Sequence, residues 1–254
     1  MLHSTRMRVA ALYDIHGNLP ALDAVLDDVR AAAVDLIVVG GDICPGPMTR
    51  DVLARLRAVD PPAHFIRGNC ERALLAEHAH PGSAQVPERA RAALQWTASD
   101  LSNEDVECLA GWPATLQVDI PHLGDVLFCH ATPRDDNEIF TRLTPDDRVA
   151  PAFAGVRSPI VVCGHTHMQF DRRVGPTRVV NAGSVGMPFG EPGAYWLLIG
   201  PNLEFRRTRY DLDRAAARIR ATHYPQAEEF ASRYVQQPPS EQQMLEQFDA
   251  HALK

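Results

Sequence analysis

An apolar segment near the middle of the chain ends abruptly in a glycine and two histidines. Ile160–Cys163 has the composition of a buried strand, and it is followed by Gly164-His165-Thr166-His167. Residues two apart in an extended chain project to the same side, so the two imidazoles can face one point. Imidazole is the commonest metal ligand among side chains. Two solvated loop histidines would explain this short pattern equally well, so its interpretation depends on the rest of the chain.

Other apolar segments end in polar residues of the same kind. They are Arg8–Tyr13 before Asp14-Ile15-His16, Leu36–Val39 before Gly40-Gly41-Asp42, His64–Arg67 before Gly68-Asn69-Cys70-Glu71, and Val126–Cys129 before His130. Helical patterns follow the first two segments. The first is carried by Leu22, Val25, Leu26 and Val29 after an expected N-cap at Asn18, and the second spans about 48–58. The alternation of strand and helix predicts an α/β fold, in which ligands bind at the carboxyl ends of the strands.

The remaining segments predict additions to one domain that spans residues 1–254. Residues 72–111 read as a helical insertion that covers one side of the site, and residues 211–254 read as a helical tail without recognisable chemistry. Three further histidines lie beside turn residues, and we interpret His78 and His80 as solvated loop residues and His122 as part of a hairpin loop.

Composition excludes several classes of protein. The net charge of −7 argues against an extended nucleic-acid surface. Met7–Tyr13 is the only apolar run near the N-terminus, and it is too short for a signal peptide or a membrane span. Five widely spaced cysteines without a CxxC pair favour a reducing cytoplasm. Composition leaves oligomerisation open.

The polar residues at the strand ends form a mixed nitrogen and oxygen ligand set. The set consists of Asp14, His16, Asp42, Asn69, His130, His165 and His167. Such ligands suit divalent Mn, Fe, Zn, Co or Ni better than Ca or Mg, and the sequence does not decide among these ions. Seven ligands are too many for one tetrahedral ion, and they suit two divalent metal ions about 3.5–4 Å apart that share a carboxylate. A site of that kind holds a hydroxide between the ions and predicts phosphoester hydrolysis by in-line attack.

The order of these motifs resembles that of the calcineurin-like metallophosphoesterases, and most closely their small bacterial phosphodiesterase-type branch. The motifs are Asp14-x-His16, Gly41-Asp42, Gly68-Asn69, His130 and Gly164-His165-x-His167, and the resemblance runs from about Arg8 to Tyr210. It implies two mixed β-sheets packed as a sandwich and flanked by helices, with the dinuclear site at the strand ends. It also implies that Asp14, His16 and His167 bind one metal, that Asn69, His130 and His165 bind the other, and that Asp42 bridges them.

The chain departs from the family pattern directly after the Gly-Asn motif. Most catalytic members have His there, which stabilises or protonates the reacting phosphate, whereas this chain has Cys70 followed by Glu71. A thiol is only a weak hydrogen-bond donor, so assistance to the leaving group is in doubt. Asn69 and Cys70 are therefore the residues whose catalytic roles need testing. Cys44-Pro45-Gly46-Pro47 replaces the Asp-Arg-Gly that the protein-phosphatase branch carries after Gly-Asp, which counts against a Ser/Thr protein phosphatase.

Two functions from different classes fit this sequence. The first is a phosphodiesterase or small-molecule phosphatase whose phosphoester substrate is a small molecule or is nucleotide-like. The second is a metal-binding scaffold or interaction protein of the same fold with little or no turnover. The complete ligand set favours the enzyme, and Cys70 favours the scaffold.

Overall fold

Two five-stranded β-sheets form the centre of the protein. The computed structural model describes residues 7–121 and 123–253, so the expectation for His122 lies outside the described residues. The first sheet has the order β10-β9-β1-β2-β3, in which β1, β2 and β3 are parallel and β9 runs antiparallel to β1. Its strands are β1 (Val9–Leu12), β2 (Leu36–Val39), β3 (Ala63–Phe65), β9 (Ala194–Ile199) and β10 (Leu203–Thr208).

The second sheet has the order β4-β5-β6-β8-β7, with β5, β6 and β8 parallel and an antiparallel strand at each edge. Its strands are β4 (Thr115–Ile120), β5 (Gly124–Cys129), β6 (Ile160–Cys163), β7 (Phe170–Val174) and β8 (Thr177–Asn181). Both sheets are mixed and helices flank them, so the expected fold class is confirmed.

The central strands are short apolar segments because both of their faces are covered. Each of the four residues of β1, β2 and β6 is buried, which is typical of parallel strands inside α/β proteins. Tyr13, just after β1, joins the two sheets, since its buried hydroxyl donates a hydrogen bond to the Val162 carbonyl oxygen at 3.0 Å. This contact fixes the spacing of the sheets next to the strand ends that carry the site.

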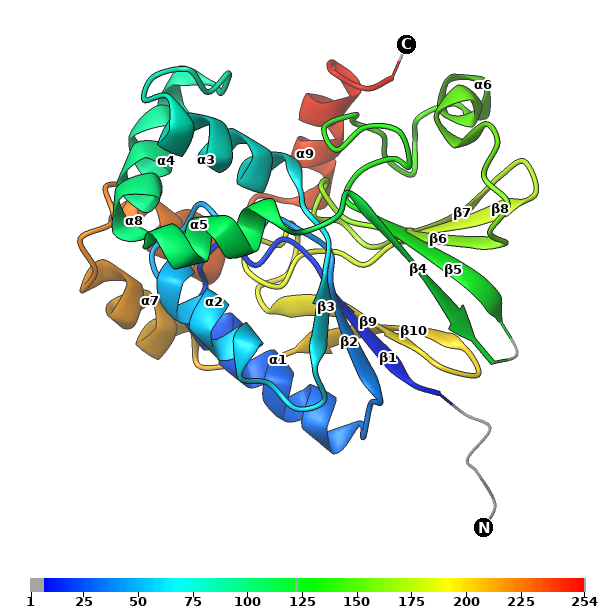
Figure 1. The fold of residues 1–254 in the computed structure, drawn as a ribbon, viewed down its shortest axis with the longest axis horizontal. Coiled ribbons are helices and arrows are strands. Elements are labelled where there is room, and N and C mark those ends of the chain that lie inside the picture. The colour runs from blue at the N-terminus through cyan, green and yellow to red at the C-terminus, as the bar shows by residue number, and fades with distance from the viewer. Residues whose placement is uncertain (1–6, 122, 254) are drawn as a thin grey trace.

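Helices α1 (Leu19–Ala31) and α2 (Thr49–Arg57) lie along the first sheet, as Figure 1 shows. The apolar positions that predicted the first helix, Leu22, Val25, Leu26 and Val29, are all buried. Asn18 caps this helix through its side chain, which accepts a hydrogen bond from the Ala21 backbone N–H at 3.2 Å.

The other helices surround these layers, with α3, α4 and α9 beyond the strand ends in Figure 1. They are α3 (Asn69–Ala79), α4 (Glu88–Asp100), α5 (Asn103–Ala110), α6 (Asp146–Val149) with a 3₁₀ turn at Ala150–Phe153, α7 (Leu212–Arg220), α8 (Ala227–Glu229) with a π-helical turn at Phe230–Gln236, and α9 (Glu241–Asp249). In the described residues, no helix is long and apolar enough to cross a membrane.

The helical segment begins earlier than the sequence pattern indicated. Helix α3 starts at Asn69 because Gly68 occupies its N-cap position, so Asn69 and Cys70 lie in the first turn of a helix rather than in a loop. The same helix includes His78, which corrects its assignment to a loop. The side chains of His78 and His80 are nevertheless exposed, as expected.

Candidate metal centre

The strand ends of both sheets bring the predicted ligands together. Nitrogen and oxygen atoms of six of them fall into two groups whose atoms lie within 4.8 Å of one another. These groups are Asp14 with His16 and His167, and Asp42 with His130 and His165. The first group holds the residues that the family resemblance implied for one metal. The second holds Asp42, the implied bridge, with two of the three residues implied for the other metal.

Short distances separate the atoms within each group and also join one group to the other. The His167 Nε2 atom lies 3.3 Å from the Asp14 Oδ1 atom and 3.3 Å from the His16 Nε2 atom. In the other group, the His130 Nε2 atom lies 3.4 Å from the Asp42 Oδ2 atom, and this same oxygen is 4.0 Å from the His16 Nε2 atom. Asp42 is therefore a member of the second group that also approaches the first, as a shared carboxylate would.

The backbone at the site is held in an unfavourable conformation. The φ angle is positive at Asp14, His16, Asp42, His165 and His167, with values from 47° to 66°. A left-handed backbone costs of order 1–3 kcal/mol at a residue other than glycine, and such residues cluster at functional sites. The bends that direct these side chains inward are thus maintained by the surrounding sandwich.

Two motif glycines allow this crowding because they lack a Cβ atom. A Cβ atom on Gly164 would lie 2.5 Å from the Asp14 Oδ2 atom, and one on Gly68 would lie 2.2 Å from the Asp42 Oδ1 atom. The φ angle of Gly164 is not positive, so this glycine serves the close approach of a carboxylate rather than a left-handed turn.

Backbone carbonyl oxygens orient two of the imidazoles. The His130 Nδ1 atom lies 2.9 Å from the Gly40 carbonyl oxygen, and the His167 Nδ1 atom lies 2.7 Å from the Met187 carbonyl oxygen. A carbonyl oxygen only accepts hydrogen bonds, so each Nδ1 carries the proton and each Nε2 faces the site. Metal-binding histidines are oriented in the same way.

Three buried atoms at the site lack a hydrogen-bond partner among the described residues. They are the Asp14 Oδ1, Asn69 Oδ1 and His130 Nε2 atoms. An unpaired buried polar atom costs roughly 1–3 kcal/mol, so three of them in one place need an explanation. All three are on predicted ligands and all can donate an electron pair to a cation. The residues present therefore fit bound divalent metal ions.

The charges of the site are strongly coupled. Burial alone would raise the pKa of the Asp42 carboxyl, but the adjacent His130 ring lowers it well below its ordinary value. Burial would likewise lower the pKa of His130, but Asp42 and Asp14 raise it to about 10. Burial and the charge of His167 lower the pKa of His16 to about 4. Without metal, a proton on His130 thus compensates part of the negative charge.

Metal binding should consequently release a proton from His130. A ligating imidazole must be neutral, whereas the raised pKa of His130 keeps this ring protonated in the metal-free protein at pH 8. His16 and His165, whose pKa values are lowered to about 4, are already neutral at pH 8. We expect Mn²⁺ binding at pH 8 to release about one proton or more per protein and to release fewer protons above pH 10. Calorimetry in buffers of different ionisation enthalpy measures this number, and binding at pH 8 without proton release would contradict the assignment of His130.

Glu71 supports the site, a role that no sequence pattern predicted. Its fully buried carboxylate accepts hydrogen bonds from the backbone N–H groups of Asp42, Ile43 and Gly68, each at 2.8 Å. It thereby ties the turn after β2 to the start of α3. Burial, and then the charge of Asp42, raise the pKa of Glu71 to about 7 despite these bonds.

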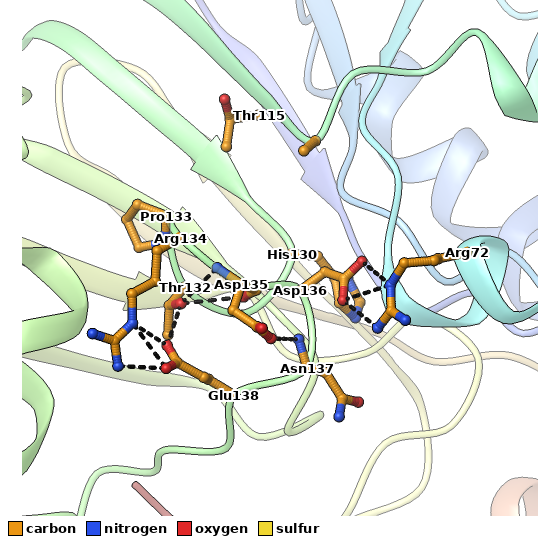
Figure 2. Close-up of a pocket in the computed structure, with 11 residues that line it drawn as sticks. Arg72, Thr115, His130, Thr132, Pro133, Arg134, Asp135, Asp136, Asn137 and Glu138 are labelled. Atoms are coloured by element: carbon orange, nitrogen blue, oxygen red, sulfur yellow. Dashed lines mark hydrogen bonds and ion pairs between the residues drawn. The ribbon is translucent and has the colours of Figure 1, made fainter. Parts of the chain in front are cut away.

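A polar cavity of about 550 Å³ opens beside His130. Figure 2 shows Arg72 and Asp136 next to this ring, where the guanidinium donates hydrogen bonds of 2.7–3.1 Å to the carboxylate. Thr132 and Asn137 form other parts of its wall. This side of the site can accept a polar or charged group.

A second cavity of about 240 Å³ opens beside His16 and Cys70 and is lined mainly by apolar groups. Tyr224, Phe230 and Tyr234, all from the C-terminal tail, are part of its wall. The tail, in which the sequence shows no recognisable chemistry, thus lies beside two site residues. The thiol group of Cys70 also lies within 4.8 Å of ligand atoms of His16 and Asp42.

Comparison with known proteins agrees with this geometry. The family model described as the calcineurin-like phosphoesterase superfamily domain matches residues 7–199. The chain therefore belongs to the calcineurin-like phosphoesterase superfamily.

Relatives of similar length share the fold. An uncharacterized protein of Methanocaldococcus jannaschii is 26% identical over 242 residues, which cover 86% of this chain and 94% of the relative. The crystal structure of a metallophosphoesterase from Sphaerobacter thermophilus has a TM-score of 0.71 at 27% identity and covers 90% of this chain and 98% of its own. That of a hypothetical protein from Pyrococcus horikoshii OT3 has a TM-score of 0.76 at 22% identity, over 92% and 100% of the two chains.

Proposed function

We propose that this protein is a metal-dependent hydrolase of phosphodiesters or small phosphomonoesters. The observation that carries this proposal is the presence of three unpaired buried ligand atoms where strands of both sheets end. Membership of a phosphoesterase superfamily supports the reaction class. The two ligand groups, joined through Asp42, support a site for two ions rather than one.

The proposed ligands divide as the family resemblance implied. Asp14, His16 and His167 would hold one ion, Asn69, His130 and His165 would hold the other, and Asp42 would contact both. Divalent ions at these positions supply Lewis acidity toward a phosphoryl oxygen and lower the pKa of a water that attacks phosphorus.

The protein's own contribution is to hold the ligands in place before the substrate arrives. The Gly40 and Met187 carbonyl oxygens keep the Nε2 atoms of His130 and His167 directed at the site. The Cys70 backbone N–H donates to the Asp42 Oδ1 atom at 2.9 Å, which leaves Oδ2 facing the histidines. Preorganised ligands need no rearrangement during the reaction, which is where much of the catalytic advantage of such sites arises.

Turnover of an aryl phosphodiester tests the proposed function. Chelator-treated protein should not hydrolyse bis(p-nitrophenyl) phosphate, and added Mn²⁺ should restore hydrolysis. His78→Ala is the matched control, because this exposed histidine on α3 lies outside both ligand groups and should not change metal content or rate. A protein that binds Mn²⁺ but turns over no mono- or diester would favour the scaffold function instead.

Cys70 is the observation that favours the scaffold. Burial, and then the charge of Asp42, raise the pKa of its thiol well above the ordinary value. The thiol therefore stays protonated, and neither a strong acid for the leaving group nor a thiolate ligand stands at this position. The proposed enzyme should depend on leaving groups that need little protonation.

Replacing this residue tests that dependence. A well-placed general acid contributes about 10²–10⁴-fold, so Cys70→His should accelerate esters of poor leaving groups more than esters of good ones. Glu71 will not orient the new ring, because its carboxylate already accepts backbone hydrogen bonds. Cys70→Ser should change little. The measurement is the slope of log kcat against leaving-group pKa, and equal slopes for wild type and Cys70→His would show that position 70 is not a vacant acid position.

A further inference from the structure

The apolar cavity beside Cys70 adjoins the proposed phosphate site but contains none of the ligands except His16. Cys70 lies at the same end of the cavity, since its thiol is within 4.8 Å of ligand atoms of His16 and Asp42. A phosphate held at the strand ends can therefore direct one ester substituent into the cavity. The residues that surround this substituent would set the substrate preference.

The far wall comes from the C-terminal tail, beyond the segment that the family model matches. The match ends at residue 199, whereas Tyr224, Phe230 and Tyr234 all line the cavity. Their rings pack edge to face in a continuous row, with centroid distances of 6.3 Å between the first two and 5.8 Å between the last two. Trp96 of α4 continues this row against Tyr224 at 5.5 Å. The wall is thus a rigid aromatic surface.

Small residues of α4 form another part of the wall. Ala90 and Ala93 line the cavity there, and their short side chains leave the space open. Arg89, on the same helix, lies at the cavity, where a guanidinium plane can stack on an aromatic ring. The Gln226 side chain donates a hydrogen bond to the Arg89 backbone carbonyl oxygen at 2.5 Å, which ties the tail to α4 beside the cavity.

The size and chemistry of this cavity define its ligand. About 240 Å³ is below the range of roughly 300–1,000 Å³ that drug-sized ligands occupy, so it holds one ring system rather than a peptide or an oligonucleotide. Burial raises the pKa of the Tyr224 hydroxyl, with a further contribution from Cys70, so this group carries no charge. Arg89 and Glu229 bring one charge of each sign to the cavity. Aromatic side chains favour flat apolar rings at stacked or edge-to-face distances.

We infer that this cavity binds a planar aromatic group, either an aryl ring or a nucleobase, on the substrate's phosphoester. This inference rests on the proposed function for the position of the phosphate and adds the class of substrate. It places the discrimination between substrates in α4 and the tail, away from the metal ligands.

Equilibrium binding tests the inference without relying on turnover. Calorimetry with the Mn²⁺-loaded protein compares phenylphosphonate with methylphosphonate, which share the phosphorus group and differ in the ring. Because its ring is buried, phenylphosphonate should bind at least about tenfold more tightly than methylphosphonate. AMP and ribose 5-phosphate form a second pair, and a preference for AMP would assign the cavity to a nucleobase, whereas a preference confined to phenylphosphonate would assign it to an aryl group.

Ala90→Phe fills the cavity from a half-buried position on α4. It should reduce the ratio of affinities within each pair of compounds to near one and leave the affinity for methylphosphonate unchanged. Ala92→Phe is the matched control, because Ala92 is exposed on the same helix and does not line the cavity. Tyr234→Ala removes an aromatic ring of the tail from the wall and should lower the affinity ratios as well.

Equal affinities within both pairs for wild type, or an affinity ratio that Ala90→Phe leaves intact, would overturn the inference alone. Failure of all four compounds to bind would overturn the proposed function and the inference with it.

Discussion

Asp42→Asn should abolish most of the phosphoesterase activity and lower the metal content of the purified protein. The substitution keeps the size of the side chain but removes the negative charge that lies 3.4 Å from the His130 Nε2 atom and 4.0 Å from the His16 Nε2 atom. Two cations near one carboxylate repel each other, and that repulsion would be less compensated. Loss of a single electrostatic stabiliser commonly costs about 10²–10³-fold in kcat, and we expect at least this loss here.

The same variant should also change the metal-free protein. The charge of Asp42 is a principal cause of the high pKa of His130, so that pKa should fall from about 10 toward its ordinary value. NMR titration of the imidazole measures the shift independently of activity. A variant that keeps two bound ions and near-normal turnover would contradict the bridging position of Asp42.

Glu71→Ala should produce the largest loss of stability among the substitutions considered. Removal of the buried carboxylate leaves the backbone N–H groups of Asp42, Ile43 and Gly68 without an acceptor. Each buried donor left unpaired costs roughly 1–3 kcal/mol, so the free energy of unfolding should fall by roughly 3 kcal/mol or more. Urea denaturation of the chelator-treated protein measures this loss separately from any loss of metal.

Two controls separate this effect from a general loss of charge. Glu71→Gln retains one carbonyl oxygen and should be destabilised less than Glu71→Ala. Glu88→Ala removes an exposed carboxylate at the start of α4, where the Arg91 ion pair is solvated, and should change stability by less than about 1 kcal/mol. If Glu71→Ala were no less stable than Glu88→Ala, Glu71 would not be the connection between the two ligand-bearing turns.

The ligand positions were predictable because local patterns specify them. An apolar strand, a glycine and polar residues two apart, as in Gly164-His165-Thr166-His167, determine a strand end and the direction of its side chains. The fold followed from the same strands once their order resembled that of a known family. Five ligand positions with a left-handed backbone could not be foreseen, because Asp, His and other non-glycine residues rarely adopt it without support from the surrounding structure.

The supporting contacts were not predictable because they join distant parts of the chain. Glu71 accepts hydrogen bonds from residues up to 29 positions away, and no periodic pattern marks such a pair. His167 meets the Met187 carbonyl oxygen across a glycine-rich turn, where the sequence carries no helical or strand period. Tyr224 reaches the cavity beside Cys70 from the far end of the chain, where the sequence showed only an interrupted helix.

A metal titration of activity tests most directly whether the strand ends hold two metal ions that hydrolyse phosphoesters. Chelator-treated wild-type protein receives Mn²⁺ in defined equivalents, while bound metal and hydrolysis of bis(p-nitrophenyl) phosphate are measured in the same samples. We predict no hydrolysis without metal and a rate that rises to a plateau at two bound equivalents, with Asp42→Asn inactive throughout and His78→Ala following the wild type. Full activity in the chelator-treated protein, or no activity with two equivalents bound, would contradict the proposed function.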